Sequence, residues 1–300
     1  MVLTNNNSTA THGVSLTKPR IVWLSSYPKS GNTWFRAFIS NLLYGGSVPV
    51  DINKLAVPWG ISRRQFDRLC GLDSSLLLPY EIDALWPEVA MRFSNGLADT
   101  PTAYLLKTHG AYGVNKANTF LEAKSINRAI YLVRNPLDVC ISFAHHSSWS
   151  IDQTIQIMGD EFHTRCQRYN YWNPSFREQV SSWSINVSSW LNTKAFPVLI
   201  LHYEDLLSNP LVFFEKAVKF LEIDADPALI LQAVEFSAFN VLQGQEQLSG
   251  FHEKGSKTPR FFRHGCAGTW RTVLSKMQIK RLLHDHGQLM DAVGYATNIL

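Results

Sequence analysis

The sequence predicts an α/β fold, a single domain with a central parallel sheet flanked by helices. Short apolar segments, each bounded by polar or charged residues, recur along the chain as buried strands of a parallel sheet do. They occupy residues 21–24, 103–106, 129–133 and 198–201. Segments with apolar residues at helical spacing separate them, and this alternation is typical of doubly wound α/β folds. In such folds ligands bind at the carboxyl ends of the strands.

The first predicted strand leads into a loop that suits an oxyanion. Its residues are Tyr27, Pro28, Lys29, Ser30, Gly31, Asn32, Thr33 and Trp34. The glycine allows a tight turn, the hydroxyls and successive backbone N–H groups donate hydrogen bonds, and the lysine adds positive charge at the start of a helix. We therefore predict a P-loop-like anion-binding loop. A nucleoside-triphosphate loop is disfavoured, because it needs a glycine ahead of Gly-Lys-Ser/Thr, and here the lysine precedes the only glycine.

Helices are predicted from apolar spacing and from residues that start or stop helices. The helix after the loop has apolar residues at 35, 38, 39, 42 and 43, and Gly45 with Gly46 ends it. Pro136 opens a second helix that runs to Ala144, since proline is tolerated in the first turn. Further helices are predicted at residues 211–221, 227–236 and 275–286.

Composition limits the class of protein. The chain has 300 residues, of which 45% are hydrophobic and 17% charged, so it can bury a large core. We expect a flexible N-terminus at residues 1–19 and one domain at residues 20–300. The net charge of +4 is dispersed without a run of Lys or Arg, which argues against a nucleic-acid partner. A small anionic ligand suffices to explain it.

The sequence also predicts a cytoplasmic protein without a membrane partner. The first nineteen residues lack the apolar core of a signal peptide, and no apolar run approaches the roughly 20 residues of a membrane span. The four cysteines are far apart and form no Cys-x-x-Cys pair, which favours reduced, mostly buried thiols. They are Cys70, Cys140, Cys166 and Cys266.

Three further segments carry residues suited to binding or chemistry. Arg134 ends the strand at 129–133 and can bind a phosphate in a bidentate manner, and Ser142, two helical turns along, can face the same ligand. His109 follows Lys107 and Thr108 after the strand at 103–106, and histidine suits proton removal near neutral pH. Residues 263–271 combine glycines with arginines, as expected of a mobile loop that contacts anions.

In their order along the chain, these segments resemble the cytosolic-type, small-molecule sulfotransferases that use 3′-phosphoadenosine-5′-phosphosulfate (PAPS). The loop at 27–34 resembles the 5′-phosphosulfate loop of that family, and Arg134 with Ser142 resembles its 3′-phosphate pair. Lys107-Thr108-His109 resembles the segment around its catalytic base. The resemblance implies a sulfuryl transfer to a hydroxyl or amine, with PAPS as co-substrate, its product PAP, and no metal.

The resemblance also implies roles for single residues. His109 would be the general base, Lys29 would stabilise the leaving phosphate oxygen, Lys107 would stabilise the sulfuryl oxygens, and Ser142 would orient Lys29 and the 3′-phosphate. The remaining nucleotide contacts would come from aromatic side chains around the adenine, a serine on the base, and the closing segment: Trp34, Tyr203, Phe239, Ser237, Arg263, His264 and Gly265. His264 and Arg271 replace lysines of the family pattern, so the contribution of position 264 is open.

Several alternatives stay open at the sequence level. A nucleotide kinase or other NTPase would need a displaced phosphate-loop motif and acidic Mg²⁺ ligands, and a non-catalytic PAP or PAPS binder would not need both Lys29 and His109. The acceptor is unidentified, although an aromatic-rich acceptor region favours a secondary metabolite over a polysaccharide. That region is expected within residues 50–99, 147–177 and 243–261, with Trp59, Phe66, Trp86, Phe93, Trp149, His163, Tyr169, Tyr171, Trp172 and Phe251 as its candidates. The family's C-terminal dimer motif is not intact, so the oligomeric state is open.

Overall fold

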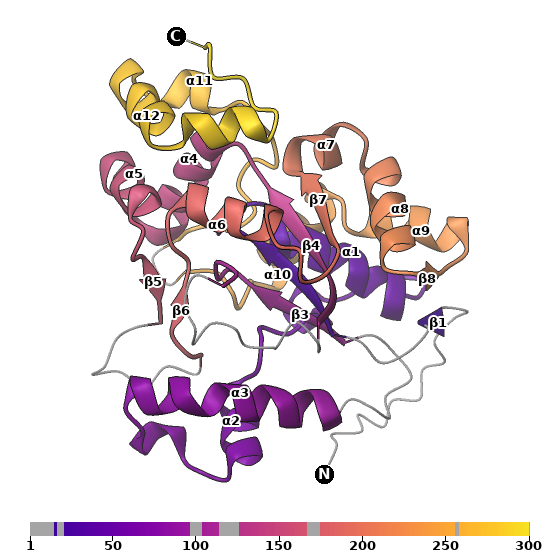
Figure 1. Ribbon diagram of the computed structural model, residues 1–300. Helices are drawn as coiled ribbons and strands as arrows, with labels where there is room; N and C mark the ends of the chain where they lie inside the picture. The colour runs from indigo at the N-terminus through magenta and orange to yellow at the C-terminus, as the bar shows by residue number, and fades with distance from the viewer. Residues whose placement is uncertain are drawn as a thin grey trace.

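A four-stranded parallel sheet forms the centre of the computed structural model, which describes residues 15–16, 21–96, 104–113, 126–166, 175–255 and 258–299 (Figure 1). The strand order is β3-β2-β4-β7, and every neighbouring pair is parallel. In chain order the strands are β2 (Ile21–Ser26), β3 (Tyr104–Thr108), β4 (Ile126–Val133) and β7 (Val198–His202). The predicted α/β class with a parallel sheet flanked by helices is confirmed.

Both faces of the sheet are buried, which explains why the strands read as continuous apolar runs. Every residue of β2 is buried, and alternate side chains enter opposite faces. Two separate clusters of buried hydrophobic side chains result.

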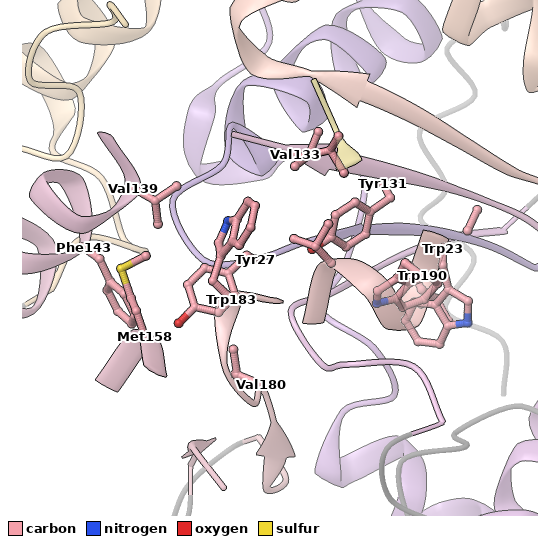
Figure 2. Close-up of a cluster of buried hydrophobic side chains, with 14 of the residues drawn as sticks. Trp23, Tyr27, Tyr131, Val133, Val139, Phe143, Met158, Val180, Trp183 and Trp190 are labelled. Atoms are coloured by element: carbon pink, nitrogen blue, oxygen red, sulfur yellow. The ribbon is translucent and has the colours of Figure 1, made fainter. Parts of the chain in front are cut away.

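 Trp23 joins one cluster with Tyr131, whereas Leu24 joins the other with Ile130. Figure 2 shows part of the first cluster, where side chains from segments far apart in the sequence, among them Trp23, Tyr131 and Trp183, gather beside the sheet.

Helices cover the two faces. On the face of Leu24 lie α1 (Asn32–Tyr44), α8 (Pro210–Phe220) and α9 (Pro227–Phe236), which contribute Phe38, Phe214 and other side chains to that cluster. On the face of Trp23 lie α4 (Pro136–Ser147), α6 (Trp183–Leu191) and α12 (Lys276–Ala292). The sheet is therefore a middle layer between two sets of helices.

The remaining elements complete the described part of the chain. The helices are α2 (Arg63–Cys70), α3 (Pro79–Gly96), α5 (Ile151–Gly159), α7 (Tyr203–Ser208), α10 (Phe239–Ser249) and α11 (Trp270–Val273), with 3₁₀ turns at Ile52–Lys54 and Ser74–Leu76. Two small antiparallel pairs join β1 (Ser15–Leu16) to β8 (Ile223–Asp224) and β5 (Thr164–Arg165) to β6 (Glu178–Gln179).

The predicted strands and helices are present, but several are longer than predicted. Strand β2 continues through Ser25 and Ser26, which are polar but pair with Thr108 and with β4 respectively. Strand β3 likewise includes Lys107 and Thr108, so only His109 of that motif follows the strand. Backbone hydrogen bonds to the neighbouring strands thus extend a strand beyond its apolar run. Residue 103 and most of the predicted flexible N-terminus, residues 1–14 and 17–19, lie outside the described residues.

Helix α12 runs to Ala292, six residues beyond the predicted end. Leu282, His286 and Met290 are buried at spacings of four residues, so one face of the helix stays packed after His286. Helices α2 and α3 lie in residues 50–99, for which no helix was predicted.

Two further properties of the described residues bear on the sequence predictions. None of their helices combines the length and apolar character that a bilayer crossing requires. All four cysteines carry free thiols, and burial raises the pKa of the Cys140 thiol to about 12.

Candidate active site

A cavity of about 520 Å³ opens where the four parallel strands end. The loop after β2, His109 after β3, Arg134 after β4 and Tyr203 after β7 all line it, as do residues 261–266. Most of the predicted site residues therefore meet in one place: Lys29, Gly31, Asn32, Thr33, Trp34, Lys107, His109, Arg134, Ser142, Tyr203, Phe239, Arg263, His264 and Gly265.

The loop between β2 and α1 turns sharply through two residues in the left-handed region. Lys29 has a φ of 68° and Gly31 a φ of 100°. A Cβ on Gly31 would lie 2.8 Å from Cδ2 of Tyr203, so the ring closes directly over the loop. No side chain caps the N-terminus of α1, which leaves the first backbone N–H groups of that helix available to an anion.

Lys29 lies deep in the cavity. Its Nζ sits 3.8 Å from the centroid of the Phe261 ring. Burial, together with the nearby charges of Lys107 and Arg134, lowers the pKa of Lys29 to about 7. A buried ammonium group with cationic neighbours favours the arrival of an anion.

Lys107 shares a carboxylate with Arg36. Its Nζ lies 3.2 Å from Oε2 of Glu253, while Nη1 of Arg36 donates to both oxygens of that carboxylate at 2.6 and 2.9 Å. Burial lowers the pKa of Lys107 to about 8, and Glu253 opposes that shift. Burial tends to raise the pKa of Glu253, but Lys107 and Arg36 hold it below its usual value. This carboxylate keeps Lys107 in place and favours its charged form.

His109 is held by both its ring and its backbone. Its Nδ1 lies 2.7 Å from the carbonyl oxygen of Ser26, so Nδ1 carries the proton and donates, and Nε2 keeps a lone pair. The Glu178 carboxylate accepts from the backbone N–H of His109 at 2.7 Å, and Asn186 donates to its carbonyl oxygen at 2.9 Å. Burial and the charges of Lys107 and Arg165 lower the pKa of His109 well below its usual value. The imidazole is therefore neutral at pH 7.

Arg134 connects the two loops that flank the cavity. It donates to the carbonyl oxygens of Lys29 at 3.2 Å and Cys266 at 3.0 Å. Its guanidinium carbon lies 4.2 Å from the centroid of the Tyr203 ring. Ser142, half-buried on α4, lines the same cavity. The predicted pairing of a strand-end arginine with a serine on the next helix is thus compatible with the structure.

A buried aspartate anchors the glycine-containing segment at 263–271. Asp138, in the first turn of α4, accepts from the backbone N–H of Gly268 at 2.6 Å, from the Thr269 hydroxyl at 2.9 Å and from the Trp270 N–H at 3.2 Å. A Cβ on Gly265 would collide with Cδ2 of Phe239, so this segment lies tightly against that ring.

Sequence reasoning missed Asp138, Glu178, Glu253 and Arg165. Glu178 occurs in a short strand without a motif, and Glu253 is separated from Lys107 by well over a hundred residues. Asp138 stands in the Arg134-to-Ser142 segment, but the acceptor role of its carboxylate depends on partners near the C-terminus. An acid in the first turn of a helix is the only local signal, and it is a common one.

Two predicted nucleotide contacts do not line the cavity. Ser237 is fully buried, and its hydroxyl donates to the carbonyl oxygen of Val234 at 3.0 Å. Ser30 is also fully buried, and its Oγ has no hydrogen-bond partner among the described residues.

The acceptor-region candidates divide into two groups. Trp59, Trp149 and His163 line the cavity. The side chains of Phe66, Trp86, Phe93 and Phe251 are buried in the hydrophobic core. Tyr169, Tyr171 and Trp172 lie outside the described residues. Within the described part of the chain, no group of three or more His, Cys, Asp or Glu side chains is arranged to hold a metal ion.

The family profile for the sulfotransferase domain matches residues 19–294. The chain belongs to this family. Among curated relatives, sulfotransferase 1B1 of Canis lupus familiaris is 23% identical over 265 residues, covering 87% of this chain and 80% of the relative. Sulfotransferase 1A1 of the same species is 24% identical over 281 residues, covering 92% and 85%. The prediction of an enzyme of the sulfotransferase class is confirmed.

Solved structures show the same fold at low identity. Mouse sulfotransferase SULT7A1, complexed with PAP, superposes with a TM-score of 0.58 at 19% identity and covers 91% of this chain and 85% of its own. Retinol dehydratase in complex with androsterone and PAP gives a TM-score of 0.56 at 16% identity, covering 93% and 83%. At these identities the structures support the fold assignment alone.

Proposed function

We propose that this sulfotransferase transfers the sulfuryl group of PAPS to a hydroxyl or amine of a small molecule. One observation carries the proposal: Lys29, Lys107, Arg134 and the neutral His109 line a single cavity at the strand ends. Cations at that position suit an anionic donor, and a neutral imidazole suits an acceptor that must lose a proton. Similar solved structures are described as PAP complexes, which supports the same donor.

The donor fits the cations of the cavity. The loop at 29–34 would bind the 5′-phosphosulfate through its N–H groups and Lys29, because the N-terminus of α1 is uncapped. Arg134, Ser142 and Arg263 would bind the 3′-phosphate. Trp34, Tyr203 and Phe239 offer aromatic faces for the adenine, since all three line the cavity. Nucleotide contacts by Ser237 and Ser30 remain predictions. Neither side chain is part of the cavity lining.

The protein's own residues suffice for the acid–base and charge requirements. With Nδ1 bound to the Ser26 carbonyl, Nε2 of His109 can accept the acceptor's proton. Lys29 would neutralise the phosphate oxygen that leaves, and Lys107 would stabilise the sulfuryl oxygens. Sulfuryl transfer requires that the nucleophile and the leaving oxygen are aligned, as well as positive charge around the transferred group. The Ser26 and Glu178 contacts hold the imidazole in one orientation.

The acceptor is proposed to be a small molecule, and a secondary metabolite remains our prediction for its class. Retinol dehydratase has been solved with retinol and with androsterone, which shows that a protein of this fold takes small apolar molecules. A cytoplasmic location likewise remains a prediction from the sequence.

Two experiments test the proposal. The purified protein is incubated with PAPS and a panel of alcohols, phenols and amines, and we expect PAP release together with the mass gain of one sulfuryl group. Calorimetry should show that PAP binds more tightly than ATP, by about 2 to 4 kcal/mol, because ATP lacks the 3′-phosphate that Arg134 would bind. Equal binding of ATP and PAP would contradict the assignment of the donor.

A further inference from the structure

Arg165 is a cavity cation that has no carboxylate partner in the part of the chain that the structure describes. It lies half-buried in β5 and lines the cavity. Among the described residues, no Asp or Glu comes within ion-pair distance of its guanidinium. Glu178 pairs with it across β5 and β6, but that carboxylate accepts instead from Thr108 and from the N–H groups of His109 and Gly110. The charge of Arg165 is therefore available to a ligand.

Trp59 places Arg165 on the same side of the cavity as the base. The guanidinium carbon lies 4.7 Å from the centroid of the Trp59 ring, and the His109 ring centroid lies 5.3 Å from it. The backbone holds this tryptophan firmly, because Lys107 donates to the Pro58 carbonyl at 2.8 Å and Gly60 donates to the Lys107 carbonyl at 3.1 Å. Lys107 Nζ also lies 4.2 Å from the centroid of this ring. A small molecule that lies beside Trp59 can therefore face both Arg165 and His109.

One of the cations that line the cavity has no role assigned toward PAPS. In the described residues its lining holds five lysines and arginines and a single carboxylate, which belongs to Glu253. Arg36 and Lys107 already bind that carboxylate. Under the proposed function, Lys29, Lys107, Arg134 and Arg263 all act on PAPS, so Arg165 alone is left for the acceptor. A guanidinium stacked on an aromatic ring presents its N–H groups edgewise, which suits a planar carboxylate.

We propose that Arg165 selects an acceptor that carries a carboxylate in addition to the hydroxyl or amine that is sulfated. This inference rests on the proposed function and names the substrate class of the same cavity: hydroxy- or amino-substituted aromatic carboxylates. The aromatic part lies beside Trp59, the carboxylate pairs with Arg165, and the nucleophile faces Nε2 of His109. The positive charge of Arg165 also offsets the repulsion between an anionic acceptor and the anionic donor.

The test uses matched pairs of phenols that differ only in charge. Para-hydroxybenzoate, para-hydroxyphenylacetate and a hydroxynaphthoate are each compared with the corresponding neutral amide, by calorimetry on the PAP-loaded protein. At least one carboxylate should bind about tenfold more tightly than its amide, and the preference should shrink at high salt. If no pair shows such a preference in the wild-type protein, the inference is wrong.

Variants separate the acceptor from the donor. Arg165→Gln should abolish the preference while changing the affinities for PAP and for the amides by less than about twofold, and Arg165→Lys should keep part of it. The matched control, Arg263→Gln, should weaken PAP binding and leave the preference intact. An Arg165→Gln variant that loses PAP affinity and keeps the preference would make Arg165 a donor contact and overturn the inference. Failure of the wild-type protein to bind PAP would instead contradict the proposed function.

Discussion

At the scale of single residues, the neighbours of His109 make it suited to act as a base. The Ser26 carbonyl determines its tautomer, and burial beside Lys107 and Arg165 keeps its ring neutral. Glu178 accepts from the backbone N–H groups of His109 and Gly110, so it fixes the backbone from which the ring extends and is thus a positioning residue. The sequence motif predicted which histidine of the ten to choose, but these partners come from other strands.

The first prediction concerns His109 itself. His109→Asn should lower turnover by about 10²- to 10⁴-fold, the usual contribution of a general base, and leave PAP affinity unchanged. The measurement is steady-state sulfation together with PAP calorimetry. His163→Asn is the matched control, because His163 also lines the cavity but has no assigned role in proton transfer. A large loss of turnover in the control and a small one in His109→Asn would move the base to His163.

The second prediction concerns the anion-binding loop. Gly31→Ala should abolish PAP binding, because its φ of 100° disfavours any side chain and the new Cβ would lie 2.8 Å from the Tyr203 ring. Gly46→Ala should be close to neutral, since nothing lies within 4 Å of the corresponding Cβ. Calorimetry with PAP and thermal melts of both variants make the comparison. Tight PAP binding by Gly31→Ala would show that the loop tolerates a different backbone.

At the scale of elements, helix α4 supports both sides of the proposed nucleotide site. Its N-terminal turn holds the segment at 263–271 through Asp138, and Ser142 on the same helix lines the cavity. Asp138 is buried, and three donors satisfy its carboxylate. A buried carboxylate with full hydrogen bonding holds its partners strongly, because its removal leaves them without acceptors.

The third prediction removes this anchor. Asp138→Ala should cost about 2 to 4 kcal/mol of stability and weaken PAP binding, since Gly268 and Trp270 lose buried acceptors. The control is Asp152→Ala in the first turn of the next helix, where an exposed carboxylate accepts from the Gln278 amide. Denaturant unfolding and PAP calorimetry check both variants. Equal effects in the two would mean that the contact does not hold the segment.

The elements also show which features of the fold and the site could be predicted from the sequence. Strands and most helices were predictable, because apolar runs and prolines such as Pro136 and Pro227 are local signals. The phosphate loop and His109 were predictable because each follows a strand. The ion triad of Lys107, Glu253 and Arg36 was not, since its members meet only after folding. Likewise, nothing local distinguishes the side chain of Ser237, which turns back onto its own helix, from one that reaches the cavity.

At the scale of the whole molecule, the parallel sheet collects positive charge at one end. Lysines and arginines at the ends of different strands lie together there, and burial makes the charges of Lys29 and Lys107 costly in the absence of an anion. The same arrangement that prepares the site for a nucleotide therefore reduces the stability of the unliganded protein. Binding and protonation are coupled through Lys29 and Lys107.

The sign of this coupling is opposite to that of a stabilising ion pair. The folded pKa of Lys29 is lowered to about 7 from a usual value of 10.5. Between these two values the unfolded chain holds a proton that the folded protein lacks, so stability rises with pH across that window. Below about pH 7 both states are protonated, and the full cost of the buried charge is present. Lys107, with a pKa of about 8, adds a second contribution over a narrower window.

The fourth prediction is that PAP binding takes up protons at pH 8. Phosphate groups beside Lys29 and Lys107 favour their charged forms and raise both pKa values, so each lysine that was partly neutral gains a proton. Calorimetry in buffers of different ionisation enthalpy measures this uptake, which should shrink at pH 6.

Lys29→Met should reduce the uptake and flatten the rise in the free energy of unfolding between about pH 7 and 10. The control Lys54→Met, at an exposed lysine outside the cavity lining, should change neither quantity. Proton uptake that is the same in wild type and Lys29→Met would show that Lys29 is already charged before the nucleotide arrives.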